Sequence, residues 1–186
     1  MNSLSWVIAI IVVIALYVVA LYNSLVKRKN RVNEAWADIE VQLKRRHNLI
    51  PNVVETVKGY AKHEKGVFEK VTKARADAAS AKSPKAQGDA ENMLSATLKT
   101  LFAVAENYPD LKANVNFLEL QRELSDTEDK IQAARRFYNS NVRDFNTAIE
   151  SVPTNIVAGI FGFKQRDMFE ISDEAVRSVP QVSFEA

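Results

Sequence analysis

The chain begins with an almost uninterrupted run of apolar residues. Between Leu4 and Tyr22 only Ser5 is polar, and no charged side chain occurs before Lys27. A helix of this length spans about 28 Å, close to the roughly 30 Å hydrocarbon core of a bilayer. The run therefore predicts a transmembrane helix. Its expected anchoring positions, with aromatic rings near both ends, are Leu4, Trp6, Ile10, Ile14, Tyr17 and Tyr22.

Basic residues follow the apolar run directly. They are Lys27, Arg28, Lys29 and Arg31. Because basic residues beside a membrane span are retained in the cytoplasm, this topology cluster predicts an N-terminus outside the cell and a cytoplasmic C-terminal domain. A cleaved signal peptide is disfavoured, since signal peptides carry their positive charge before a shorter apolar run.

A second pattern begins at Val32, where apolar positions recur alternately every four and three residues. This stripe comprises Val32, Trp36, Ile39, Leu43, Arg46, Ile50, Val53, Val57, Tyr60, Glu64, Val67, Val71, Ala74 and Ala78. The spacing is typical of a long helix packed at a shallow angle on others, as in a coiled coil. We therefore predict a continuous helix over residues 23–80, kinked at Pro51. The charged members Arg46 and Glu64 either set the register or mark where the helix turns outward.

Prolines and glycines divide the rest of the chain. Residues 83–89 are expected to form a loop before a helix over 89–106, and residues 107–110 a turn before a third helix that ends near Ser151. The predicted fold class is all-α, with an N-terminal transmembrane helix followed by a bundle of long helices. We divide it into a membrane anchor (1–26), a long-helix bundle (27–152) and a C-terminal tail that packs on or caps the bundle (153–186).

Composition offers little chemistry. The 186 residues include no cysteine, which excludes disulfides, thiol catalysis and cysteine-bound zinc. His63-Glu64 begins like a zinc-protease motif, but Val67 stands where the second histidine is needed. The acidic residues of 119–129 resemble a solvated, salt-bridged helix face. We therefore expect no catalytic residue, no metal and no cofactor, and conclude that the protein is not an enzyme.

Charge is distributed unevenly along the chain. The segment from Lys27 to Arg75 contains 13 basic and 6 acidic residues, whereas the net charge of the whole chain is only +2. Such a basic segment suits pairing with the acidic remainder as well as attraction to anionic lipid headgroups. Without overall basicity or interleaved aromatic residues, we expect no nucleic-acid binding.

Several sequence strings resemble the LemA family. They are Tyr22–Val26 (YNSLV), Lys44–Ala61 (KRRHNLIPNVVETVKGYA), Leu101–Pro109 (LFAVAENYP), Ala133–Asn139 (AARRFYN), Phe161-Gly162-Phe163 and Val179–Phe184 (VPQVSF). The resemblance covers nearly the whole chain. It implies a bacterial membrane protein with one N-terminal span and a bundle of long antiparallel helices. The inner membrane is therefore the expected location.

The resemblance also frames the expected function. Some family members are associated with magnetosome membrane formation, and others are encoded near membrane metalloproteases. We expect a non-enzymatic membrane-anchored scaffold or adaptor that shapes membrane or binds protein partners; the alternative is an accessory or regulatory subunit of a membrane metalloprotease. Expected partners are the lipid bilayer and an unidentified membrane or cytosolic protein, with assembly into a homo-oligomer left open. Phe161, Gly162 and Phe163 are candidate partner contacts, with filling of the bundle core as the equal alternative.

Overall fold

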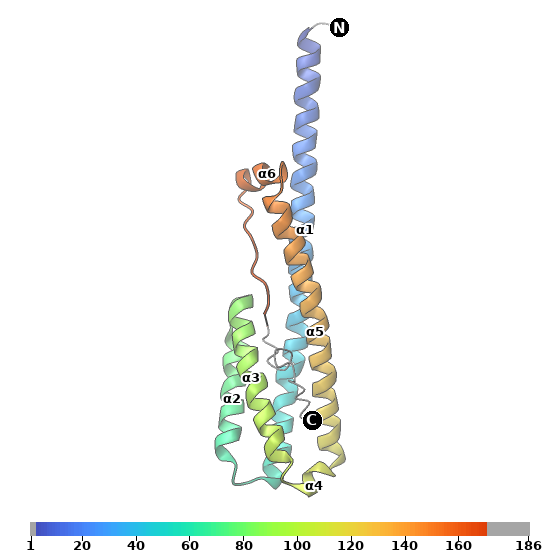
Figure 1. Ribbon diagram of the computed structural model, residues 1–186. Helices are drawn as coiled ribbons and strands as arrows, with labels where there is room; N and C mark the ends of the chain where they lie inside the picture. The colour runs from blue at the N-terminus through green and yellow to red at the C-terminus, as the bar shows by residue number, and fades with distance from the viewer. Residues whose placement is uncertain (1–2, 171–186) are drawn as a thin grey trace, which may run out of the picture. The chain divides into compact units, whose positions relative to one another are not determined.

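The computed structural model of the protein describes residues 3–170, which are mostly helical (Figure 1). The helices are α1 (Ser3–Tyr60), α2 (Lys65–Ser80), α3 (Pro84–Ala105), α4 (Pro109–Lys112), α5 (Val115–Glu150) and α6 (Thr154–Ile160). No strand occurs in this part of the chain, and the helices pack against one another. The predicted all-α class is confirmed.

Two compact units share the long helices. One contains Met1–Asn48 and Arg122–Met168, and the other contains Leu49–Gln121 and Phe169–Ala186. In α1 the division falls beside Pro51, which lies inside the helix. The kink expected at this proline stays a prediction.

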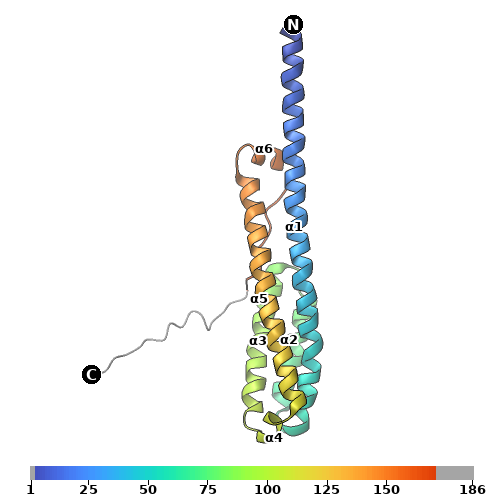
Figure 2. The ribbon, with the colours of Figure 1, turned by 90° about the vertical axis from the view of Figure 1, so that its right-hand side faces the viewer.

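In the first unit α1 and α5 run side by side in opposite directions (Figures 1 and 2). Each contributes one apolar stripe with spacings of three, four or seven residues. The buried members include Leu25, Val32, Ala35, Ile39 and Leu43 of α1, and Leu124, Ile131, Tyr138, Val142 and Phe145 of α5. Full burial of a large aliphatic or aromatic side chain is worth about 1.5–3 kcal/mol. These facing stripes therefore hold the helix pair together.

In the second unit α2 and α3 pack closely against one another. Their buried stripes again follow helical spacing and consist of Phe68, Val71, Ala74 and Ala78 of α2 and Leu94, Leu98, Leu101 and Ala105 of α3. The ring of Phe102 lies 6.2 Å from that of Phe117 at the start of α5. Aromatic pairs at this separation add to the packing of the hairpin end.

The predicted continuous helix over residues 23–80 is wrong in two respects. It begins earlier, because the membrane segment and the stripe belong to the same α1, and it ends at Tyr60. A turn over residues 61–64 leads into α2, with Gly59 and Gly66 on either side of it. Glycine is a poor helix former, so the turn forms where two glycines weaken the helix. Glu64 therefore precedes α2 as its N-cap, and the buried position falls on Phe68 instead of Val67.

The loop expected over residues 83–89 is also wrong, since α3 already begins at Pro84. Ser83 caps this helix, its hydroxyl oxygen accepting a hydrogen bond from the amide of Ala86 at 3.2 Å. Proline at the first helical position completes a favourable start. Gly88 lies inside the helix, where a Cβ atom would meet the backbone oxygen of Glu170 at 2.3 Å. The glycine thus serves a close approach of two segments and does not break the helix.

Candidate functional site

Five of the six predicted anchoring residues lie on the part of α1 that no other described element covers, and Tyr22 lies at its end, where residues 161–163 pack against it. Leu4, Trp6, Ile10, Ile14 and Tyr17 are all more than half exposed. An 18-residue window of this helix has a mean hydropathy of 2.9, and none of it is buried. Among the described helices, α1 is the one long and apolar enough to cross a membrane. A soluble protein rarely exposes so large an apolar surface, so the segment is suited to lipid.

The topology cluster follows on the same helix. Lys27, Arg28, Lys29 and Arg31 are all exposed, while Leu25 between the membrane segment and the cluster is fully buried. Burial of one face of α1 therefore starts where the apolar run ends. The residues of the cluster lie at this transition.

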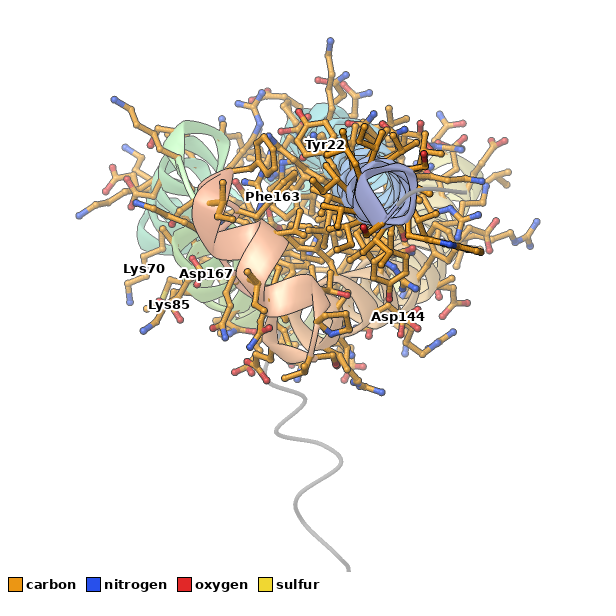
Figure 3. The ribbon with its side chains drawn as sticks, turned by 90° about the horizontal axis from the view of Figure 1, so that it is seen from above. Tyr22, Lys70, Lys85, Asp144, Phe163 and Asp167 are labelled. Carbon is orange, nitrogen blue, oxygen red and sulfur yellow. The ribbon has the colours of Figure 1, made fainter. Side chains whose placement is uncertain are left out.

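An aromatic cluster forms in the first unit, near the end of the apolar run of α1. The Tyr22 ring lies 4.7 Å from the ring of Phe161 and 5.8 Å from that of Phe163. Phe163 in turn lies 6.4 Å from the buried Phe145 of α5. Figure 3 looks down on this end and shows Tyr22 and Phe163 near one another. Phe163 is thus joined to the core, whereas Phe161 remains 52% exposed.

A specific backbone turn directs the chain from α6 back along α5. Gly162 has φ = +69°, a left-handed conformation that L side chains rarely adopt. The amide of Phe163 donates a hydrogen bond to the carbonyl oxygen of Ala158 at 2.9 Å. This arrangement is typical of a helix that ends at a glycine. It explains why Gly162 separates the two phenylalanines.

The segment over residues 163–168, which we call the strap, is fastened to α5 by two polar side chains. The side-chain amide of Asn146 donates a hydrogen bond to the carbonyl oxygen of Arg166 and accepts one from its backbone N–H, each at 2.9 Å. The Tyr138 hydroxyl donates to the carbonyl oxygen of Asp167 at 2.9 Å. Burial raises the pKa of Tyr138, as does the charge of Asp167, while the charge of Arg166 lowers it. Tyr138 therefore stays a neutral donor at physiological pH.

A groove of about 600 Å³ opens between α1, the end of α6 and the strap. Four aromatic side chains line it, those of Tyr22, Phe145, Phe161 and Phe163. Three basic side chains line it as well, those of Lys29, Lys164 and Arg166. The lining contains no acidic residue. The groove therefore combines an apolar wall with three basic side chains.

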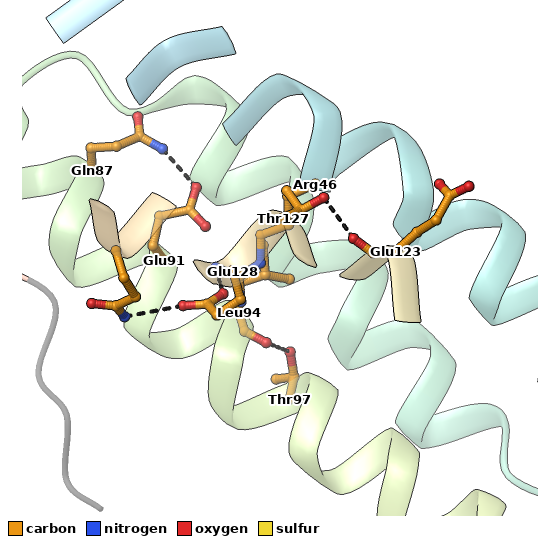
Figure 4. A network of polar contacts seen from close by, with 9 residues as sticks. Arg46, Gln87, Glu91, Leu94, Thr97, Glu123, Thr127 and Glu128 are labelled. Carbon is orange, nitrogen blue, oxygen red and sulfur yellow. Dashed lines mark hydrogen bonds and ion pairs between the residues drawn. The ribbon is translucent and has the colours of Figure 1, made fainter. Parts of the chain in front are cut away.

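Several buried polar groups elsewhere have structural partners. Arg46 is buried on the stripe of α1, and its guanidinium lies 3.3 Å from a carboxylate oxygen of Glu128 on α5 (Figure 4). This contact accounts for a charge at that position of the stripe. In the second unit the side-chain amide of Gln87 donates to the carbonyl oxygen of Ala78 and to the buried carboxylate of Glu91, each at 2.9 Å.

The described part of the chain contains no group of potential metal ligands. Within residues 3–170 no three histidine, cysteine, aspartate or glutamate side chains come together as a potential ligand set. His47 lies buried in the first unit, and His63 is exposed in the turn before α2. The acidic residues of 119–129 lie along α5, and most are exposed, as expected of a solvated face.

Sequence reasoning found some of the groove and missed the rest. It singled out Tyr22 as a membrane anchor, Lys29 as part of the topology cluster, and the two phenylalanines as partner or core contacts, but it did not connect these three predictions. It missed Lys164 and Arg166 altogether. The only available signal was the succession of aromatic and basic residues in Phe161–Arg166 (FGFKQR), which is too short to indicate a site.

Comparison with known proteins assigns the chain to a family. The model of the LemA family matches residues 35–184. Protein LemA of Metamycoplasma hominis is 28% identical over 152 residues, covering 81% of this chain and 69% of that protein. Magnetosome protein MamQ 2 of Paramagnetospirillum magneticum is 26% identical over 192 aligned positions, covering 88% and 71%. Magnetosome protein MamQ of Magnetospirillum gryphiswaldense is 25% identical over 174 positions, covering 80% and 64%. This helical, membrane-associated chain belongs to the LemA family.

Proposed function

We propose that the protein is a non-enzymatic scaffold or adaptor that holds a helical bundle at the cytoplasmic face of the bacterial inner membrane. The observation that carries this proposal is the continuity of α1 from Ser3 to Tyr60. One end of this helix is exposed and apolar, and the other contributes a buried stripe to the bundle. Because no turn separates the two stretches, the bundle is joined to its anchor by regular helix and not by a flexible linker.

Orientation follows from charge. The first acidic residue of the chain is Glu34, so the four basic residues between Lys27 and Arg31 face no acidic neighbour within the preceding sequence. Basic residues beside a span favour the cytoplasmic side. This supports the proposal that the N-terminus lies outside.

The absence of cysteine from the sequence provides the test of orientation. Ser3→Cys and Ser80→Cys variants are treated in intact cells with a membrane-impermeant maleimide. Both side chains are exposed, and Ser80 is the last residue of α2. We expect Ser3→Cys to be labelled in intact cells and Ser80→Cys only after lysis. The reverse pattern would place the bundle outside and overturn the proposed orientation.

Partner binding is proposed for the exposed face around Phe137. This side chain is 57% exposed on α5 and lines a shallow depression of about 370 Å³ with Arg31, Glu34 and Asn141. Exposed aromatic residues beside charged ones are common in protein interfaces. The face lies on the same unit as the membrane segment, so a partner bound there would be held near the bilayer.

The test replaces Phe137 with the photocrosslinking residue p-benzoylphenylalanine in living cells. The same replacement at Val115, which is exposed at the start of α5, is the control. A protein adduct specific to position 137 is expected of an adaptor. An adduct with a membrane metalloprotease would favour the accessory-subunit alternative, and one of twice the chain mass would indicate a homo-oligomer. Equal patterns at both positions would remove the support for this face.

A further inference from the structure

The groove between α1 and the strap lies next to the end of the membrane segment. Tyr22 closes the apolar run, and Lys29 lies about two helical turns, or about 10 Å, further along α1. The headgroup layer on each side of the hydrocarbon core is about 5–8 Å thick. When the apolar run spans the core, the groove therefore begins at the hydrocarbon edge and extends across the headgroup layer.

Among the residues that the structure describes, no carboxylate pairs with the basic side chains of the groove. Within the described part of the chain, neither Lys29 nor Lys164 forms an ion pair. The Arg166 guanidinium makes a 3.4 Å contact with the side-chain oxygen of Asn33, which carries no charge. Ammonium and guanidinium groups that converge without a carboxylate suit a phosphate-bearing anion.

The surface beside the groove is apolar. Ile156 and Ile160 of α6 are 61% and 72% exposed, and Phe161 follows them directly. In Figures 1 and 2 α6 lies across the direction of α1 and not along it. A short helix in this orientation lies parallel to a membrane that α1 crosses, so its apolar side chains can enter the membrane–water interface. A soluble phosphate compound would leave this surface without a function.

From these observations we infer that the groove binds the phosphate headgroup of an anionic phospholipid. Lys29 and Lys164 contact the phosphate, Arg166 adds a third positive charge, and the acyl chains lie along the apolar part of α1 and the exposed side chains of α6. The inference rests on the membrane anchoring in the proposed function. It depends on neither the proposed orientation nor the scaffold role.

The test measures lipid binding to the full chain in a non-ionic detergent. Purified protein is titrated with phosphatidylglycerol or phosphatidylcholine, and bound lipid is counted by native mass spectrometry. We expect tighter binding of phosphatidylglycerol. In a Lys29→Gln/Lys164→Gln variant its dissociation constant should rise about fivefold per charge removed, or about 25-fold in total. Glutamine keeps much of the side-chain length and hydrogen-bonding capacity, so the loss reports charge.

The matched control removes two lysines outside the groove. Lys44 and Lys130 are exposed in the same unit and form no ion pair within the described residues. The Lys44→Gln/Lys130→Gln variant should bind phosphatidylglycerol as the unaltered chain does. Equal weakening in the two variants would show diffuse charge attraction and overturn the inference. Unchanged binding by the groove variant, with an unchanged circular dichroism spectrum, would overturn it as well.

Two further measurements distinguish a lipid from a soluble phosphate as the ligand, and the groove from the membrane anchor. Inorganic phosphate at millimolar concentration should not displace the lipid; displacement would identify a soluble phosphate as the ligand and overturn the lipid assignment. Flotation with vesicles of phosphatidylcholine alone reports anchoring, because it does not depend on the groove. Failure to float would count against the proposed function, whereas loss of phosphatidylglycerol selectivity in a protein that floats would count against the groove alone.

Discussion

The two stretches of α1 share one helix but differ in what surrounds them. In the membrane stretch, from Leu4 to Tyr17, most side chains are apolar and exposed. In the bundle stretch, from Leu25 to Ile50, the apolar residues that recur at helical spacing form one buried stripe. A helix that is apolar all round suits a uniformly apolar medium, and a one-sided stripe suits a helix between water and a protein core. The comparison shows that exposure in a structure without lipid is itself informative. The first stretch has the length, composition and exposure of a helix suited to crossing a membrane.

The largest effect is expected from charges in the membrane stretch. A Val12→Arg/Val13→Arg variant places two guanidinium groups near the middle of the apolar run, at a cost to membrane insertion of about 6 kcal/mol. We expect the variant to lose membrane association in flotation and carbonate-extraction assays. Both valines are exposed, so the helical bundle should be unaffected.

Val41→Arg is the matched control. Val41 is as exposed as Val13 but lies in the bundle stretch of the same helix. An arginine there should leave flotation unchanged, since a charge on the solvated face of a helix has little cost. An equal loss of flotation in Val41→Arg and in Val12→Arg/Val13→Arg would show that the membrane stretch and the bundle stretch of α1 do not face different surroundings.

The next effect concerns the buried stripe. Ile39→Ala removes a fully buried side chain between α1 and α5 and should lower the free energy of unfolding by about 2–5 kcal/mol. Ile14→Ala removes the same atoms from the membrane stretch and should change the free energy of unfolding by less than about 0.5 kcal/mol. Urea unfolding of the full chain in detergent, followed by circular dichroism, measures both. A similar loss in both variants would contradict the division of α1.

The sequence was sufficient to predict both stretches because each depends on a local period. A continuous apolar run and a stripe spaced by three and four residues are readable without knowing what packs against them. The turn over residues 61–64 was missed, since the stripe passes through it and only Gly59 and Gly66 weaken the helix. The start of α3 was missed because a glycine within a short polar segment usually indicates a loop. Only the structure shows that Gly88 is needed for the close approach of the Glu170 backbone.

The groove could not have been predicted in the same way. Its basic residues Lys29, Lys164 and Arg166 come from segments more than a hundred residues apart in the sequence. What joins them is the pairing of α1 with α5 and the attachment of the strap by Asn146. Tertiary contacts of this kind leave no period in the sequence.

A smaller effect distinguishes the two charged members of the predicted stripe. Glu128→Gln removes the carboxylate beside the buried Arg46 and should lower the free energy of unfolding by about 1 kcal/mol, because a buried guanidinium loses a charged acceptor. The figure is modest because the Glu128 side chain is 36% exposed and water screens the pair.

Glu64→Gln provides the comparison for this pair. Glu64 caps α2 without a side-chain hydrogen bond, so its loss should change stability by less than about 0.5 kcal/mol. Denaturant unfolding at pH 7 ranks the two variants. A larger loss of stability in Glu64→Gln than in Glu128→Gln would indicate that Glu64 lies in the buried stripe, as the sequence pattern predicted.

The last expected effect depends on pH. Tyr138 packs beside Trp36 of the bundle stretch, with ring centroids 5.3 Å apart, and its hydroxyl holds the strap through Asp167. Tyr138→Phe should therefore lower the free energy of unfolding by about 1 kcal/mol at pH 7. Tyr17→Phe, in the exposed membrane stretch, should leave that free energy unchanged.

The sign of the pH dependence follows from the raised pKa of Tyr138 in the folded protein. An unfolded tyrosine ionises near pH 10, whereas burial keeps the folded side chain protonated to higher pH. The stabilising contribution of Tyr138 is therefore complete below about pH 10 and is lost as the pH rises towards the folded pKa. The difference between the unaltered chain and Tyr138→Phe should narrow as the pH rises above about 10, the unfolded pKa. A difference that widens over this range would mean that ionised Tyr138 is better accommodated in the folded protein than in the unfolded chain, and so that the strap does not bury its hydroxyl.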